Sequence, residues 1–336
     1  MSDRPIDLLR TLADNAHRRL FLASHIVLDD EVPHILRRAR ERGVSVRLFT
    51  QVADQEDGGL RIKTLGLDGQ YTGADLARHD ATLRQLADNG VQIQSGPVFS
   101  HVKLWVADGH VAATGSANLT TNSLGAENGW AIEVMQPFQG DVATALAAVA
   151  AWLWDSSTLR CDADAATGFR ITQQLGKNSP PPQHPAVIVG VPGHGYPILE
   201  ALRTAIRRAE RSILLVTMSA YRWTDLPGFE AALKDALDRG VSVTLARRAP
   251  EARFTECPSI TAMQGLGMRV IDIPGLHAKG FVIDDAWTAI FTGNLNPFSL
   301  AGSKPTDHVE LAVVDSAGNA HLDRSRSRLL EVTTIR

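Results

Sequence analysis

A histidine and a lysine two residues apart occur twice in this sequence. The first copy reads His101-Val102-Lys103 and the second reads His277-Ala278-Lys279. In an extended segment, residues two apart point to the same face, so each copy would present an imidazole beside an ammonium. A phosphate group suits such a pair, because the ammonium donates hydrogen bonds and the imidazole can attack or transfer a proton. The pattern therefore predicts chemistry on a phosphate.

The residues that follow each pair also repeat. An aspartate comes five positions after the lysine and a Gly-x-x-Asn segment comes later; the two sets are Asp108, Gly115, Ser116 and Asn118, and Asp284, Gly293, Asn294 and Asn296. Serine and asparagine side chains can donate to phosphoryl oxygens, so we expect Ser116 and Asn294 to bind substrate. The two aspartates precede turns, and we expect them to fix the hairpins as structural parts of the motif, together with Gly115 and Gly293.

Cleavage of a phosphodiester requires that its negative charge be offset while the attacking and leaving oxygens are held in line. Two lysines and two asparagines, Asn118 and Asn296, can do this without a metal, so we expect no metal and no other cofactor. One neutral imidazole can attack phosphorus while a second, protonated imidazole gives its proton to the leaving oxygen. Glu127 and Glu310 are candidates to orient the imidazoles, a role that carboxylates commonly take beside histidine.

This repeated signature resembles that of the phospholipase D superfamily, which is His-x-Lys, four residues, Asp, six residues, Gly-Ser-x-Asn. The first copy matches at every position, whereas the second has Asn294 in place of the serine and eight residues before Gly293. The resemblance implies a phosphohistidine intermediate, no metal requirement and a site between two similar lobes. It also implies that His101 attacks and His277 does the acid and base work, because the histidine of the first motif is often the nucleophile in that family.

Both halves of the chain repeat one plan of helices and strands. Apolar residues at helical spacing alternate with short Val, Ile and Leu runs, and Arg-Gly-Val-Ser-Val occurs at 42–46 and at 239–243. We predict an α/β protein with two similar lobes from an internal duplication, each a mixed β-sheet flanked by helices, and with the active site at the pseudo-twofold interface. Consecutive prolines predict a linker at 177–189 between lobes at 1–176 and 190–336.

The composition is that of an ordinary globular protein, with 336 residues, 44% hydrophobic and 21% charged. A net charge of −3 gives no overall attraction to nucleic acid or acidic lipid, so a local patch must hold any polyanion. Cys161 and Cys257 lie far apart and lack metal-ligand spacing. With no bilayer-length apolar run and no leader-like segment, we expect a cytoplasmic protein without stable membrane association. A monomer would carry a complete site, and a homodimer is left open.

Nucleic acid, either DNA or RNA, is the expected substrate and partner of the predicted phosphodiesterase. The segment 115–120 resembles the bacterial nuclease branch of the superfamily, and Arg247 and Arg248 follow a strand, where they could contact backbone phosphates. A phospholipase D or phosphatidyl transferase is the alternative, and it would need an apolar surface to meet lipid. A noncatalytic phosphate-binding scaffold is a second alternative, which the retention of both His-x-Lys pairs disfavours.

Overall fold

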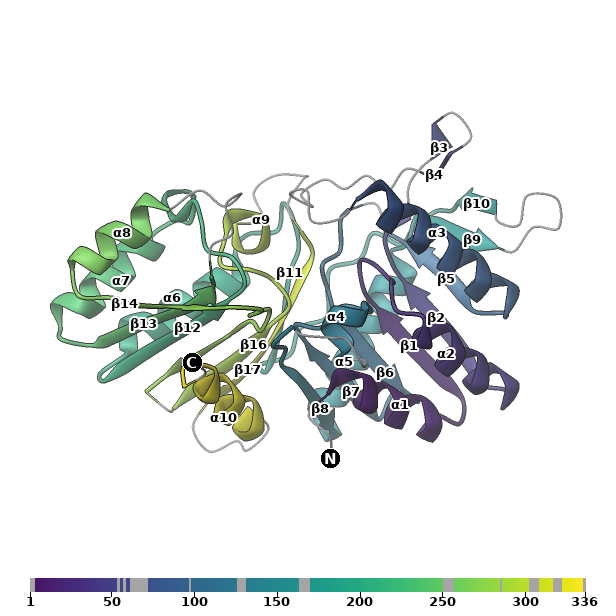
Figure 1. The fold of residues 1–336 in the computed structure, drawn as a ribbon, viewed down its shortest axis with the longest axis horizontal. Coiled ribbons are helices and arrows are strands. Elements are labelled where there is room, and N and C mark those ends of the chain that lie inside the picture. The colour runs from purple at the N-terminus through teal and green to yellow at the C-terminus, as the bar shows by residue number, and fades with distance from the viewer. Residues whose placement is uncertain are drawn as a thin grey trace. The chain divides into compact units, whose positions relative to one another are not determined.

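The chain folds as two α/β units, each with its own sheet and helices (Figure 1). The computed structural model describes residues 4–52, 55–56, 59–60, 72–96, 98–125, 131–162, 170–249, 257–284, 286–301, 308–316 and 322–334. The first unit comprises Met1–Gly129 and Pro137–Pro182, and the second comprises Trp130–Gln136 and Gln183–Arg336. The predicted architecture of two mixed sheets flanked by helices is confirmed.

The first unit is built on a sheet that has eight strands among the described residues. In sheet order these are β10 (Arg170–Gln173), β9 (Leu159–Asp162), β5 (Gln92–Ser95), β2 (Ser45–Phe49), β1 (Arg19–Ala23), β6 (Leu104–Ala107), β7 (Val111–Gly115) and β8 (Met135–Gln139). β1 and β2 are parallel, as are β2 and β5, whereas β6 is antiparallel to both β1 and β7. A separate ribbon pairs β3 (Gln55–Glu56) with β4 (Gly59–Leu60).

Helices cover both faces of this sheet. They are α1 (Pro5–Asn15), α2 (Glu31–Glu41), α3 (Gly73–Asp88), α4 (Thr121–Leu124) and α5 (Gly140–Asp155). Helices α1, α2 and α3 pack on β6, β2 and β5 respectively, and α5 packs on β1, β6 and β7. Phe21 of β1 meets Trp154 of α5 edge to face, with 6.3 Å between ring centroids. Because strand residues alternate, the buried Leu20 and Leu22 point to the opposite face, away from α5.

The second unit repeats this plan with a sheet of seven strands among its described residues. Their order is β11 (Val187–Gly190), β17 (Glu310–Ser316), β16 (Trp287–Phe291), β15 (Gly280–Ile283), β12 (Ser212–Thr217), β13 (Ser242–Arg248) and β14 (Arg269–Ile273). The helical elements are α6 (Pro197–Arg208), η1 (Trp223–Asp225), α7 (Phe229–Asp238), α8 (Pro258–Gly265), α9 (Pro297–Leu300) and α10 (Asp323–Val332). β11 pairs with β17, so the end of the segment predicted as a linker is an edge strand.

The aspartate of each motif ties a hairpin turn to the start of the neighbouring strand. Asp108 and Asp284 have φ values of 52° and 54°, a left-handed conformation that aspartate tolerates. Each carboxylate accepts three backbone N–H groups at 2.6 to 2.8 Å, from His17, Arg18 and Arg19 and from Glu210, Arg211 and Ser212. Burial alone would raise the pKa of each carboxyl, but the N–H donors lower it below its ordinary value.

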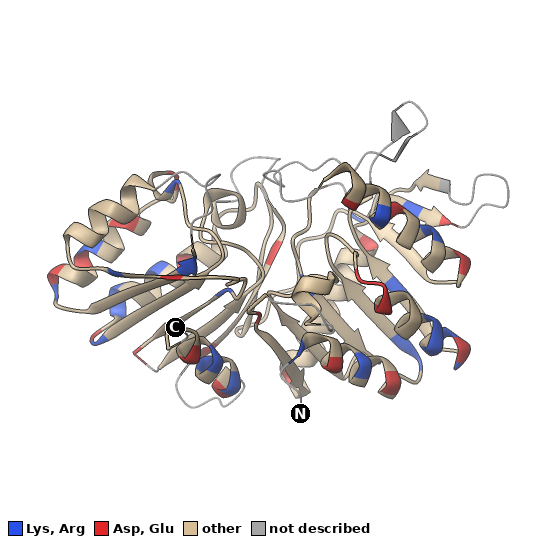
Figure 2. Ribbon diagram, in the orientation of Figure 1, with Lys and Arg blue, Asp and Glu red and all other residues tan. Residues whose placement is uncertain are grey.

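Charged side chains gather on the helices and turns of both units, and the strands are largely uncharged (Figure 2). On α2, for example, Arg37 pairs with Glu41 one turn later at 3.2 Å. Such exposed pairs contribute little to stability, so the buried apolar faces of the strands and helices hold each unit together. Among the described residues, none of the helices combines the length and the apolar character needed to cross a bilayer.

We expect Asp108→Ala and Asp284→Ala each to lower the free energy of unfolding at pH 7 by about 1–3 kcal/mol, because three N–H groups lose their acceptor. Urea denaturation measures this, with Asp14→Ala on an exposed position of α1 as the control. Since folding lowers the carboxyl pKa, the contribution is complete above the unfolded value of about 3.9 and disappears as the pH falls through the folded value. Equal stability of wild type and both variants at pH 7 would contradict this role.

Candidate active site

The two His-x-Lys segments are extended and lie immediately before β6 and β15. Lys103 and Lys279 are 0% and 1% exposed, and both histidines are 8% exposed. Each ammonium donates to the carbonyl oxygen of the histidine two residues earlier, at 2.7 Å from Lys103 to His101 and at 2.6 Å from Lys279 to His277. The lysine therefore holds the backbone of its histidine as well as placing a positive charge beside the ring.

The environment of Lys279 makes its charge sensitive to pH. Burial, the largest cause, lowers the pKa of Lys279 to about 7. The charge of Arg248 lowers it further, whereas the carboxylates of Glu133 and Glu310 act in the opposite direction. The ammonium is thus surrounded by one cation and two anions, and a bound phosphate would favour its charged form.

A buried carboxylate orients His277. Glu133 Oε1 lies 2.6 Å from His277 Nδ1, and the Glu133 side chain is 1% exposed. The neighbouring Ile132 carbonyl accepts the backbone N–H groups of His277 and Ala278 at 2.9 and 2.6 Å. The carboxylate at Nδ1 fixes the orientation of the His277 ring and stabilises its imidazolium form.

His101 lies in a cluster of three aromatic rings in the first unit. The ring of His25, from the loop after β1, is 4.9 Å from the His101 ring and tilted by 39°. The Phe99 ring stacks on His101 at 6.3 Å, with an interplanar angle of 24°. His25 is 2% exposed, and sequence reasoning missed it because no spacing signal connects the loop after β1 to the motif. These contacts fix the plane of the His101 imidazole.

The pairing of the hairpins changes the predicted match between the two motifs. Leu104 pairs with Thr114 in the first hairpin, and Gly280 pairs with Ile290 in the second. This register places Asn294, and not Asn296, at the position of Asn118. The loop in the second motif is therefore not longer than in the first, and the predicted match of Gly293 to Gly115 and of Asn296 to Asn118 is wrong. Thr292 corresponds to Ser116, and Phe291 corresponds to Gly115.

Two further contacts support this correspondence. Leu119 and Leu295, which follow the matched asparagines, form equivalent bridges to the loops after β1 and β12. Asn118 and Asn294 each have a side-chain oxygen without a hydrogen bond among the described residues. By contrast, Asn296 Oδ1 accepts the backbone N–H of Ser299 at 3.1 Å and caps α9. Asn296 thus has a local structural contact that Asn294 does not share.

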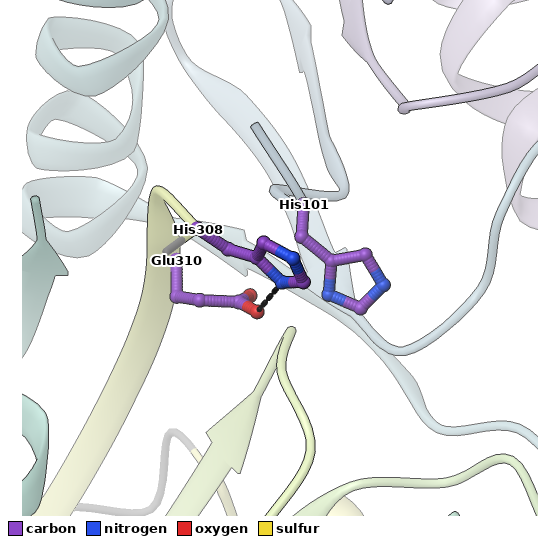
Figure 3. A group of neighbouring side chains, drawn as sticks. All are labelled: His101, His308 and Glu310. Atoms are coloured by element: carbon purple, nitrogen blue, oxygen red, sulfur yellow. Dashed lines mark ion pairs between the residues drawn. The ribbon is translucent and has the colours of Figure 1, made fainter. Parts of the chain in front are cut away.

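Glu310, the predicted orienting residue of the second motif, is fully buried at the start of β17. Thr292 Oγ1 donates to its Oε2 at 2.5 Å, and His308 Nδ1 lies 3.6 Å from its Oε1 (Figure 3). A Cβ at Gly293 would lie 2.5 Å from Glu310 Oε1, so only glycine fits there. Within either unit, the described residues include no group of three histidine, cysteine or acidic side chains close enough together to hold a metal ion.

Glu127, the other predicted orienting residue, lies outside the described residues. Glu133 was not predicted, although it occupies a place like that of Glu310. Glu133 stands two residues before β8, and Glu310 begins β17, which has the corresponding place in the second sheet. The signal available in the sequence was a carboxylate at or just before the start of the last strand of each motif.

The two predicted substrate-binding arginines have different surroundings at the end of β13. Arg247 Nε donates to Asp272 Oδ1 on the neighbouring β14 at 2.7 Å, and its side chain is 17% exposed. Arg248 lies close enough to Lys279 for its charge to lower the lysine pKa. Of the two, Arg248 is therefore the one near the His-x-Lys segment.

Comparison with known families supports the resemblance seen in the motifs. Residues 9–154 match the family described as "Cardiolipin synthase, PLD-like domain". This part of the chain is therefore similar to a phospholipase D-like domain. The predicted resemblance to the phospholipase D superfamily is thus confirmed. No protein of curated function matches the sequence.

Solved structures share the fold over nearly the whole chain. Phosphatidylserine synthase from Haemophilus influenzae Rd KW20 is 13% identical with a TM-score of 0.65, over 97% of this chain and 83% of that one. Polyphosphate kinase from Porphyromonas gingivalis is 14% identical with a TM-score of 0.56, over 98% of this chain and 48% of that one. Nuc from Salmonella typhimurium, a phospholipase D family member, is 22% identical with a TM-score of 0.35, over 44% of this chain and 93% of that one. At these identities the first two matches show a common fold.

The two asparagines of the second motif should respond differently to truncation. We expect Asn296→Ala to lower the free energy of unfolding by about 1 kcal/mol, because α9 loses its cap. Asn294→Ala should change it by less than about 0.5 kcal/mol, since its side-chain oxygen has no partner among the described residues. Thermal or urea unfolding of both variants tests this, and a larger loss in Asn294→Ala would contradict the assigned contacts.

Proposed function

We propose that this protein is a metal-independent phosphodiesterase that works through a phosphohistidine intermediate. The observation that carries the proposal is the buried lysine ammonium, held on the carbonyl oxygen of its paired histidine, in both motifs. Removing an ammonium from water is unfavourable, and a phosphate oxyanion is the ligand that would offset this best. The same arrangement places each ammonium close to an imidazole that can react.

The proposed reaction has two balanced steps. A ring nitrogen of His101 attacks phosphorus, the bond from phosphorus to the leaving oxygen breaks, and protonated His277 gives its proton to that oxygen. Water then attacks the phosphohistidine while neutral His277 accepts the water proton, and the phosphorus–nitrogen bond breaks to restore both histidines. Lysines, asparagines and Ser116 would donate to the phosphoryl oxygens. We propose that both motifs serve one phosphorus atom.

The surroundings of the two histidines support this division of roles. The Glu133 carboxylate at His277 Nδ1 stabilises an imidazolium, as an acid requires before it gives up its proton. His101 packs against the rings of His25 and Phe99, which fix its plane for attack. Because the Glu133 carboxylate contacts His277, we assign acid and base work to His277 and attack to His101.

Nucleic acid is the substrate class that we propose first. Arg248, next to Lys279, could neutralise a neighbouring phosphate of the same strand. Among the described residues the exposed large apolar side chains are Leu175, Leu266 and Leu330, which lie on separate segments. This scattered distribution of apolar side chains favours a water-soluble phosphodiester substrate over one that is embedded in a lipid layer.

Lipid is the second candidate, and the comparisons favour it. The matching family is described as cardiolipin synthase, and one solved neighbour is a phosphatidylserine synthase. In that case an alcohol would replace water in the second step, and the protein would transfer a phosphatidyl group. The noncatalytic scaffold would instead bind phosphate without turnover.

A substrate panel with chelator present distinguishes these candidates. Single-stranded DNA, duplex DNA, RNA and phosphatidyl lipid with an alcohol acceptor would each be incubated with the protein. We expect turnover of a nucleic acid with EDTA present, a loss of about 10²–10⁴-fold or more in His101→Gln, and a smaller but clear loss in Asn294→Ala. His110→Gln, on an exposed turn, is the matched control.

The outcomes of this panel are separable. Turnover of lipid alone would support phosphatidyl transfer, and binding without turnover of any substrate would support the scaffold. Turnover that EDTA abolishes and added metal restores, or full activity in His101→Gln, would contradict the proposed mechanism.

The pKa of Lys279 predicts how activity depends on pH. Above a pH of about 7 the free lysine loses its charge, so kcat/KM should fall, by about tenfold per pH unit once the lysine is mostly neutral. Arg248→Gln should move this midpoint upward, because the arginine charge lowers the lysine pKa. Lys279→Met should be less active and should lack this descending limb. If neither variant changed the midpoint of the pH profile, the descending limb would come from the titration of another group.

A further inference from the structure

A basic cavity lies in the first unit, at the other end of β1 and β6 from His101. It has a volume of about 370 Å³ and lies between α5 and the sheet face that carries Arg19, Phe21 and Arg47. Leu20 pairs with Ala107 at the cavity end of these strands, and Ala23 pairs with Leu104 at the His101 end. The four residues of β6 span about 13 Å, so the cavity is separate from His101 and Lys103.

Three arginines are among the residues that line this cavity. They are Arg18, Arg19 and Arg47. Arg47 is partly buried, donates to Gln92 Oε1 at 3.2 Å and lies over the Trp154 ring at 4.9 Å from its centroid. Burial and then the charge of Arg19 lower the pKa of Arg47, whereas Asp155 acts in the opposite direction. Arg19 and Arg47 therefore repel each other across the cavity.

Two carboxylates lie near these arginines and offset part of their charge. Asp108 also lines the cavity, but its oxygens accept three backbone N–H groups. Asp155 pairs with Lys177 at 2.6 Å. Arg18 and Arg19 have no side-chain hydrogen bond or ion pair within the described ranges. Positive charge thus predominates in this cavity, and an anion would relieve the repulsion.

The fold itself does not require these arginines. In the second unit Ser212 holds the place of Arg19, since both donate their backbone N–H to the motif aspartate. Thr244 holds the place of Arg47. Arg47 pairs with the residue two positions after Arg19 on β1, and Thr244 pairs with the residue two positions after Ser212 on β12. The duplicated sheet therefore forms without either charge, and both arginines belong to the first unit alone.

The rest of the cavity wall consists of apolar side chains, several of which are small. Phe21, Val106 and Trp154 line it together with the alanines of α5, which leave room above the sheet. The volume is at the lower end of the range for small-molecule sites, about 300–1,000 Å³. A ligand that fills it would combine an anionic group with a compact apolar or planar body.

We propose that this cavity binds a phosphomonoester with a planar organic group, of the class of a nucleoside monophosphate. The phosphate would lie between Arg19 and Arg47, with Arg18 at the rim, and the planar group would rest on the Phe21 and Trp154 wall. This site lies apart from the two His-x-Lys motifs, so it does not depend on the proposed phosphodiesterase activity.

Isothermal titration of the full chain tests the proposal, with adenosine monophosphate, adenosine and inorganic phosphate as probes. We expect the monophosphate to bind at least tenfold more tightly than either adenosine or phosphate. Arg19→Gln and Arg47→Gln should each weaken it at least tenfold, while Arg38→Gln, on an exposed position of α2, should leave it unchanged. If Arg47→Gln fails to fold, Arg19→Gln still tests the proposal, because Arg19 is exposed and its replacement should not disturb folding.

Lys279→Met separates this site from the motif residues. Monophosphate binding should persist in Lys279→Met with the wild-type affinity. Binding that Lys279→Met removes and Arg19→Gln leaves intact would place the ligand at the motif and overturn the proposal. Absence of monophosphate binding by wild type, or equal affinity for adenosine, would also overturn it.

Discussion

Keeping a lysine ammonium out of water is the constraint on which the site depends. Lys103 and Lys279 are both buried, and each is held by a short hydrogen bond to the carbonyl of its own motif histidine. Such burial is unfavourable unless dipoles and opposite charges surround the group. In the second unit burial lowers the pKa of Lys279 to about 7, and Glu133 and Glu310 raise it while Arg248 lowers it. The rigid packing of Gly293 against Glu310 keeps these groups in place.

Local pattern was sufficient to predict most of the fold and the centre of each motif. The spacing of apolar residues indicated the helices and strands, and the repeated Arg-Gly-Val-Ser-Val segments indicated the duplication. His-x-Lys spacing placed each imidazole with its ammonium because residues two apart in an extended chain share a face. The position of each aspartate before a turn was likewise readable from the sequence, whereas the three backbone donors to Asp108 lie about 90 residues away.

Features that depend on strand register and on distant segments could not be predicted in this way. A Gly-x-x-Asn pattern in the second half suggested Asn296 as the partner of Asn118, but hairpin pairing assigns Asn294. The carboxylate on His277 comes from Glu133, which is 144 residues away in sequence. His25 meets His101 only because the loop after β1 turns toward the motif. Each of these contacts requires the sheet to be formed before it can be recognised.

The segment 130–136 makes the second unit discontinuous along the chain. Ile132 exchanges backbone hydrogen bonds with Gly275, His277 and Ala278, and Gln136 accepts a hydrogen bond from Ser325 Oγ at 2.8 Å. During synthesis this segment leaves the ribosome long before its partners. Its polar groups therefore stay hydrogen-bonded to water until the C-terminal strands have been synthesised. A proteolytic fragment that began after the proline-rich segment would lack the carboxylate of His277, and only noncovalent reassociation with the N-terminal fragment could restore it.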